Sequence, residues 1–168
     1  MGLNFIMVVL GIDPGSLKIG YALIELNLDS FKYLFSGIFT YQKYKFIERP
    51  KHIYLDIFNL VNKFHPDEVA LEGLIYVKSV PALSKLAQAR GAILAALNTD
   101  KIFEYAPNLI KSTVTAYGLS SKEDVQRTLN LIYGNINFKS LDEADALAIA
   151  TTHAVCRKVR QVEQMPSA

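Results

Sequence analysis

The amino-acid sequence contains no tryptophan and a single cysteine, Cys156. One cysteine cannot form a disulfide bond within the chain, and the sequence has no CxxC or paired Cys/His spacing of the kind that binds zinc. An internal disulfide and a zinc site are therefore excluded, and we expect the protein to work in the reducing cytoplasm.

The chain also lacks a strong excess of charge of either sign. Eighteen lysines and arginines are balanced by sixteen aspartates and glutamates, which leaves a formal net charge of +2. So small a total gives no argument for nucleic-acid binding, which must rest on how the charges are distributed. The apolar run FIMVVLGI is followed by Asp13 and is far shorter than the roughly 20 residues that a membrane span needs, so we interpret it as a strand.

Hydrophobic residues are abundant, at 51% of the sequence. In 168 residues they are enough for one core but not for two full domains. We therefore expect one domain over residues 1–168, with a flexible tail from about residue 161.

Hydrophobic periodicity divides the chain into strands and helices. Three successive strands are predicted at residues 6–13, 18–26 and 31–40, which implies an antiparallel meander. Helices are predicted at residues 46–65, 80–98, 107–118, 121–134 and 141–159, with short strands at 68–74 and 101–106. This order predicts an α/β fold with a mixed five-stranded sheet, three antiparallel strands and then parallel ones, flanked by helices on both faces.

Four acidic residues lie at the ends of these elements. Asp13 ends the first strand before a Pro-Gly turn, and Glu72 ends the fourth strand directly after the apolar letters VAL. Asp142 and Asp145 stand three apart, and hence on one face, at the start of the last helix. Turn formation and the helix dipole are ordinary explanations for single acids, but an unpaired charge in an apolar strand is costly.

If the first and fourth strands are neighbours, these four carboxylates converge at one edge of the sheet. Such a cluster repels itself and raises its own pKa values unless divalent cations bind to it. Oxygen ligands without His or Cys suit Mg²⁺ or Mn²⁺. His153 lies eight residues past Asp145 and is turned about 80° from it on a helix, so we do not expect it to bind the metal.

Five motifs, in order along the chain, resemble those of the RuvC family of Holliday-junction resolvases, the crossover junction endodeoxyribonucleases. They are LGIDPGSLKIGYALIE, ALEGLIYVKS, LAQARGAILAAL, FEYAPNLIKSTVTAYGLSSKEDVQ and DEADALAIATTHA. The resemblance extends over nearly the whole chain, from about Met7 to Arg157. The resemblance implies a ribonuclease-H-like fold, a homodimer, and metal-dependent resolution of four-way DNA junctions in recombination and repair. It implies paired symmetric nicks that leave 5′-phosphate and 3′-hydroxyl ends, and it leaves open a branch-migration helicase as a further partner.

The resemblance also implies roles for particular residues. The metal-binding catalytic acids are expected to be Asp13, Glu72, Asp142 and Asp145. They would hold two Mg²⁺ ions, for which Mn²⁺ may substitute, with Asp13 as the bridging ligand. Lys111 and Lys122 match the two family lysines that hold or polarise the DNA phosphate near the active site.

The chain departs from the family pattern in the loop after Glu72. Three positions on, the family commonly carries a Phe that stacks at the junction centre, whereas this chain has Ile75 followed by Tyr76. Either Tyr76 takes over the stacking, since any aromatic face can receive a base, or the loop acts as an apolar wedge. Lys78 and Arg90 are the other candidate DNA contacts, and Arg90 alternatively packs its helix against a partner subunit.

A four-way junction has approximate two-fold symmetry, so paired nicks require two active sites related by the same symmetry, as in a C2 homodimer. The helix at 80–98 carries an apolar stripe that suits either pairing between two subunits or burial on the chain's own sheet. The stripe consists of Leu86, Ala89, Ile93 and Ala96.

Three alternative functions stay open at this stage. A nuclease of the same fold acting on other branched DNA would carry the same motifs. An actin-like nucleotide-binding protein also ends its first strand with GIDxG, but it would lack the paired acids of the last helix and would bind ATP tightly. A catalytically silent junction-binding module would lack one of the acids, and all four are present.

Overall fold

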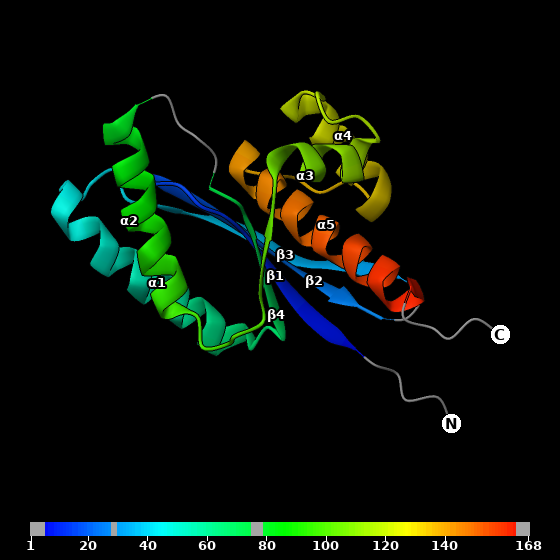
Figure 1. The fold of residues 1–168 in the computed structure, drawn as a ribbon, viewed down its shortest axis with the longest axis horizontal. Coiled ribbons are helices and arrows are strands. Elements are labelled where there is room, and N and C mark those ends of the chain that lie inside the picture. Colours follow the sequence, from blue (N-terminus) through cyan, green and yellow to red (C-terminus); the bar gives the residue numbers. More distant parts are fainter. Residues whose placement is uncertain (1–5, 28–29, 75–78, 164–168) are drawn as a thin grey trace.

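A five-stranded sheet lies at the centre of the molecule, in the strand order β3-β2-β1-β4-β5 (Figure 1). The computed structural model describes residues 6–27, 30–74 and 79–163. The strands are β1 (Met7–Asp13), β2 (Lys18–Leu26), β3 (Phe31–Thr40), β4 (Glu68–Glu72) and β5 (Ile102–Tyr105). The helices are the short 3-10 helix η1 (Phe46–Glu48), α1 (Arg49–Phe64), α2 (Val80–Ala96), α3 (Pro107–Thr115), α4 (Lys122–Tyr133) and α5 (Leu141–Glu163).

The central strand β1 pairs antiparallel with β2 and parallel with β4. The expectation that the first and fourth strands are adjacent in the sheet is therefore confirmed. Because β1 and β4 run in parallel and Ile12 is in register with Leu71, Asp13 and Glu72 follow at the same edge of the sheet.

Helices cover both faces of the sheet, as the sequence predicts. Figure 1 shows α1 and α2 on one side and α3, α4 and α5 on the other. Successive strand residues point to opposite faces, so Val9 and Ala70 belong to the core cluster under α5, whereas Leu10 and Leu71 belong to the cluster under α1 and α2. No helix in the part of the chain that the structure describes is both long and apolar enough to cross a membrane.

Several helix ends differ from the sequence prediction. The segment predicted as one helix from residue 46 begins as η1, and α1 then starts at Arg49 with Pro50 in its first turn, where the missing N–H of proline costs nothing. The helix α3 ends at Thr115 because Ala116 adopts a left-handed backbone. The helix α5 continues to Glu163, and residues 164–168 of the tail expected to be flexible lie outside the described residues.

The apolar stripe of α2 packs inside the chain itself. Ala89, Ile93 and Ala96 are fully buried in the cluster shared with α1 and the sheet, and Leu86 is half-buried. The prediction that this stripe forms a dimer interface is therefore wrong, and its alternative, burial within the chain, is confirmed. The physical reason is that α2 must cover Leu71 and its neighbours on a central strand, and this uses up the apolar side of the helix.

Two glycines allow α5 to lie very close to the sheet. A Cβ atom at Gly20 would lie 2.0 Å from the backbone oxygen of Asp142, and one at Gly11 would lie 2.3 Å from that of Ala146. Gly20 is also the register partner of Asp13. The missing side chain at Gly20 therefore lets the first turn of α5 settle onto the strand end that carries Asp13.

This close approach predicts opposite effects for two glycine substitutions. Gly20→Ala should lower the free energy of unfolding by about 1–3 kcal/mol or more, because its methyl group meets backbone rather than a flexible side chain. Gly91→Ala, in the middle of α2 with open space around its Cβ position, should raise it by about 0.5–1 kcal/mol. Urea denaturation measures both values. Equal effects of the two substitutions would contradict the close packing of α5.

Candidate active site

Three of the four predicted acids line one pocket of about 280 Å³ at the edge of the sheet. Asp13 comes from the end of β1, Glu72 from the end of β4, and Asp145 from the second turn of α5. Lys111 of α3 and Lys122 of α4 line the same pocket, and apolar side chains of α3, α4 and α5 form the rest of its wall. Five elements that are distant in sequence thus bring their charged side chains to one place.

The fourth acid, Asp142, is not among the residues that line this pocket. It lies one helical turn before Asp145, and its backbone is the part of α5 that packs on Gly20. Its charge still acts on the site, since it raises the pKa values of both Asp13 and Lys122. Asp142 therefore belongs to the electrostatic environment of the pocket.

Burial and mutual repulsion perturb the carboxylates. Burial, followed by the charges of Asp145 and Glu72, raises the pKa of Asp13 to about 8. Burial and the charge of Asp145 also raise the pKa of Glu72. The cluster carries more negative charge than the protein itself neutralises, which is the condition for binding cations.

Lys122 supplies part of the missing positive charge. It occupies the first turn of α4, which Ser121 caps by accepting a hydrogen bond from the backbone N–H of Asp124. The Lys122 ammonium donates to, and forms an ion pair with, the Asp145 carboxylate. Burial opposes its charge, but the hydrogen bond and charge of Asp145 outweigh burial and raise the pKa of Lys122.

The residues of the pocket fit a hard divalent cation. Every acidic donor is a carboxylate, and neither His nor Cys lines the pocket. Within the described ranges, no three His, Cys, Asp or Glu side chains are already arranged as a ligand group. Asp145 is instead paired with the ammonium of Lys122, which supplies positive charge to this cluster.

Arg90 is not among the residues that line the pocket. Its side chain is almost fully buried, with 4% exposed. One guanidinium nitrogen donates to the backbone oxygen of Glu72 at 2.8 Å, and another forms an ion pair with Glu104 on β5. The expected DNA contact of Arg90 stays a prediction. Its contacts within the chain hold the end of β4 against β5.

Sequence analysis missed the close approach at Gly20 and the partners of Arg90, although local signals existed. Gly20 interrupts a strand pattern, which often marks a close backbone approach. Arg90 follows the buried Ala89 in a helix that packs on the core, where a buried charge requires a partner, and Glu104 meets this need from β5. Two of the predicted DNA contacts, Tyr76 and Lys78, lie outside the described residues, as does Ile75.

Comparisons with known proteins agree with this architecture. A family model described as crossover junction endodeoxyribonuclease RuvC matches residues 9–153. The protein of that name from Halothermothrix orenii is 40% identical over 152 residues, covering 88% of this chain and 92% of that protein. The one from Brachyspira hyodysenteriae is 38% identical over 151 residues, covering 88% and 94%.

A solved structure provides a similar match in three dimensions. The structure of T. thermophilus RuvC in complex with a Holliday junction substrate aligns with a TM-score of 0.83 and 27% identity, over 92% of this chain and 96% of that one. The yeast mitochondrial Holliday junction resolvase Ydc2 aligns with a TM-score of 0.66 at 18% identity and shares the fold.

The raised pKa of Asp13 predicts how stability depends on pH without metal. Its carboxyl titrates near 3.8 when unfolded and at about 8 when folded, so the folded state holds the proton more tightly. The free energy of unfolding should therefore fall as pH rises from about 4 to about 8. Asp13→Asn should remove this loss. At pH 8 the variant should be more stable by at least about 1 kcal/mol, since even a quarter of such a shift is worth that much.

Urea denaturation in a chelating buffer between pH 5 and pH 8 measures the effect. Asp100→Asn, an exposed aspartate outside the pocket, is the matched control and should follow the wild type. A wild-type stability that stays constant over this range, or one that rises, would show that Asp13 is not held in a repulsive site.

Proposed function

The chain belongs to the RuvC family of crossover junction endodeoxyribonucleases and is thus a metal-dependent nuclease of Holliday junctions, and we propose that it cuts DNA at the pocket between Asp13, Glu72 and Asp145. The observation that carries this proposal is the convergence of three carboxylates from three distant segments on one pocket that also contains two lysines. Burial and the neighbouring carboxylates raise the pKa of Asp13, which matches a site that works with cations.

The proposed cofactor is a pair of divalent ions, Mg²⁺ or Mn²⁺, which when bound supply an activated water and stabilise the departing 3′ oxygen. Asp13 is the best candidate to bridge two ions, because it is the acid on which the charges of Asp145, Glu72 and Asp142 all act. Glu72 and Asp145 would hold the flanking positions, and Asp142 stands one turn away. Cleavage would leave 5′-phosphate and 3′-hydroxyl ends.

The two lysines are proposed to position the scissile phosphate. Lys111 and Lys122 lie on α3 and α4, opposite the strands that carry Asp13 and Glu72. A phosphate between them would be held by charge and would take the place of Asp145 as the partner of Lys122. Tyr76 stays the proposed stacking residue at the junction centre and Lys78 a proposed phosphate contact.

We propose a homodimer that uses the outer face of α2, in place of the stripe that is buried. The exposed residues on this face are small and recur every three or four positions, so two such helices can approach closely. They are Ser84, Ala87, Gly91 and Ala95. The two-fold symmetry of a four-way junction is the reason to expect a dimer.

Three further expectations are retained as proposals. Residues 1–168 would act as one nuclease domain, a branch-migration helicase would be a further partner, and the protein would work in the cytoplasm.

Among the alternatives, an actin-like protein is disfavoured because Asp142 and Asp145 are present on α5 and the family match extends over residues 9–153. A nuclease for other branched DNA differs from a strict resolvase only in substrate choice.

A synthetic immobile junction tests the proposed activity. With Mg²⁺, the wild type should make paired, symmetric nicks that a ligase can seal, and without metal it should bind but not cut. Asp13→Asn should bind the junction as tightly as the wild type but cut it about 10³-fold more slowly or worse, because loss of a bridging ligand disables the ions and leaves the basic surface intact.

Controls separate this proposal from its alternatives. Asp100→Asn should cut at the wild-type rate, since Asp100 lies outside the pocket. Replication forks and flaps labelled in the same way should be cut more slowly than the four-way junction. Equal cutting of all branched substrates would favour the broader nuclease, and undiminished cutting by Asp13→Asn would place the active site elsewhere.

The proposed dimer surface predicts the effect of one added charge. Gly91→Glu should leave the fold intact, because the Cβ position of Gly91 faces open space, but it should convert the protein to a monomer in analytical ultracentrifugation. The monomer should nick one strand at a time. Asn62→Glu adds the same charge to an exposed position of α1 and should stay dimeric. A Gly91→Glu dimer would rule out this face of α2.

A further inference from the structure

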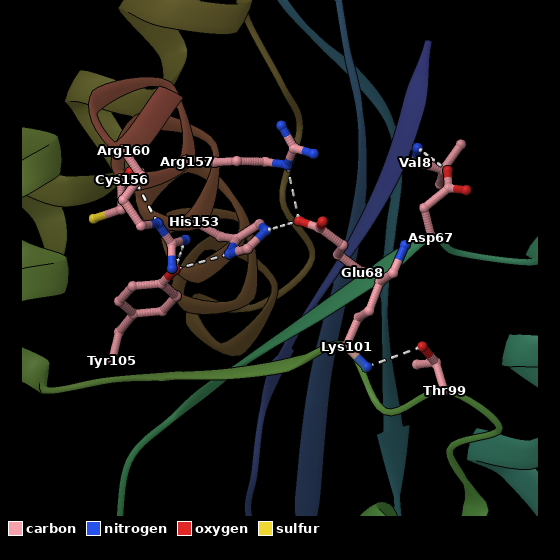
Figure 2. A network of polar contacts seen from close by, with 10 residues as sticks. All are labelled: Val8, Asp67, Glu68, Thr99, Lys101, Tyr105, His153, Cys156, Arg157 and Arg160. Carbon is pink, nitrogen blue, oxygen red and sulfur yellow. Dashed lines mark hydrogen bonds and ion pairs between the residues drawn. The ribbon is translucent and has the colours of Figure 1, made fainter. Parts of the chain in front are cut away.

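A buried polar network, separate from the pocket, joins α5 to β4 and β5 (Figure 2). The His153 ring is fully buried, and its Nε2 atom lies 2.6 Å from a carboxylate oxygen of Glu68 at the start of β4. Its Nδ1 atom lies 2.8 Å from the hydroxyl oxygen of Tyr105 at the end of β5. Arg157, one turn further along α5, donates to the same Glu68 oxygen at 3.1 Å.

The charges in this network determine which atom donates in each bond. Burial lowers the pKa of His153, and this outweighs the opposing effect of Glu68. Burial alone would raise the pKa of Glu68, but its bonds to His153 and Arg157 outweigh that and lower it. The imidazole is therefore neutral. It donates through Nε2–H to the Glu68 carboxylate and accepts from the Tyr105 hydroxyl at Nδ1.

The bond between Glu68 and His153 is separated from the pocket along two elements. The strand β4 runs from Glu68 to Glu72, and α5 runs back from Asp145 in its second turn to His153 near its middle. Four strand residues at about 3.3 Å each cover about 13 Å, and eight helix residues at about 1.5 Å each cover about 12 Å. The two lengths match, so the bond between Glu68 and His153 aligns Asp145 with Glu72.

The inner surface of α5 between these residues consists mostly of small side chains. Buried alanines supply much of it, with Leu147 and Ile149 as larger members, and glycines at positions 11 and 20 of the sheet lie against its backbone. The alanines are Ala144, Ala146, Ala148 and Ala150. At the start of the helix, the Ser36 hydroxyl of β3 donates a hydrogen bond to Glu143 at 3.0 Å. Apolar contact has no direction and by itself constrains the register of the helix less than directional bonds do. A directional hydrogen bond between buried groups constrains it strongly.

We propose that the bond between His153 and Glu68 fixes the position of α5 along β4 and thereby sets the separation of Asp145 from Glu72 at which the divalent ions bind. His153 is thus a positioning residue that never touches the ions or the DNA. The inference rests on the proposed metal site at Asp13. It gives a reason for burying a charged network beside α5, where hydrophobic packing alone would stabilise the fold.

Binding of Mn²⁺ alone, measured by electron paramagnetic resonance or calorimetry, tests this proposal without requiring DNA cleavage. His153→Leu removes both ring hydrogen bonds and should weaken Mn²⁺ binding about tenfold, the lower end of the range for residues that orient metal ligands. His153→Gln, whose amide can still donate to Glu68, should recover part of the loss. Glu68→Gln keeps the size of the side chain but loses its charge, and it should weaken binding in the same direction if His153→Leu does not fold.

Thr151→Val is the matched control, because Thr151 is also a buried polar residue of α5. Its hydroxyl bonds to Tyr133 of α4 at 2.9 Å and to the Leu147 carbonyl at 2.7 Å, away from β4. This variant should lose stability yet bind Mn²⁺ within about twofold of the wild type, because its bonds do not reach the strand that carries Glu72.

The outcomes distinguish the positioning role from the metal site itself. If the wild type binds Mn²⁺ no better than Asp13→Asn, the proposed metal site is wrong. If the wild type binds and Asp13→Asn does not, but a folded His153→Leu binds as the wild type does, the positioning role alone is refuted. Equal weakening by His153→Leu and Thr151→Val would also refute it, since the effect would then follow stability and not register.

Discussion

Repulsion between half-buried carboxylates is the constraint on which the rest of this structure depends. Asp13, Glu72 and Asp145 share a pocket, and burial together with like charge raises the pKa values of Asp13 and Glu72 there. A chain free to relax would move these groups apart. They stay together because each projects from the end of a rigid strand or the first turns of a packed helix.

The surrounding residues each oppose this repulsion in a different way. Gly20 on β2 lets the first turn of α5 lie close to Asp13, its register partner on β1, and Arg90 holds the backbone of Glu72. Lys122 forms an ion pair with Asp145. Near the middle of α5, His153 ties the helix to β4. The unfavourable site is therefore stabilised in part by residues that lie outside the pocket.

Predictions from the sequence were most successful for features in which burial follows a local period. The five strands were all found, because the period of burial depends on neighbours along the chain. The sequence did not reveal the strand contacts of Arg90, and prediction failed at the stripe of α2 around Ile93. In both cases the residue type was noticed, but the partner came from another element, Glu104 for Arg90 and the α1 cluster for Ile93.

By itself, the sequence determined the order of the elements, the family pattern and which acids stand at element ends, since these are properties of residue spacing. The tertiary structure alone decided which acids share a pocket, which face of α2 remains free, and that His153 bonds to Glu68 and Tyr105. The reason is physical. Exposure, charge and hydrogen bonding depend on what packs against a side chain, and spacing along one element does not reveal the surface opposite.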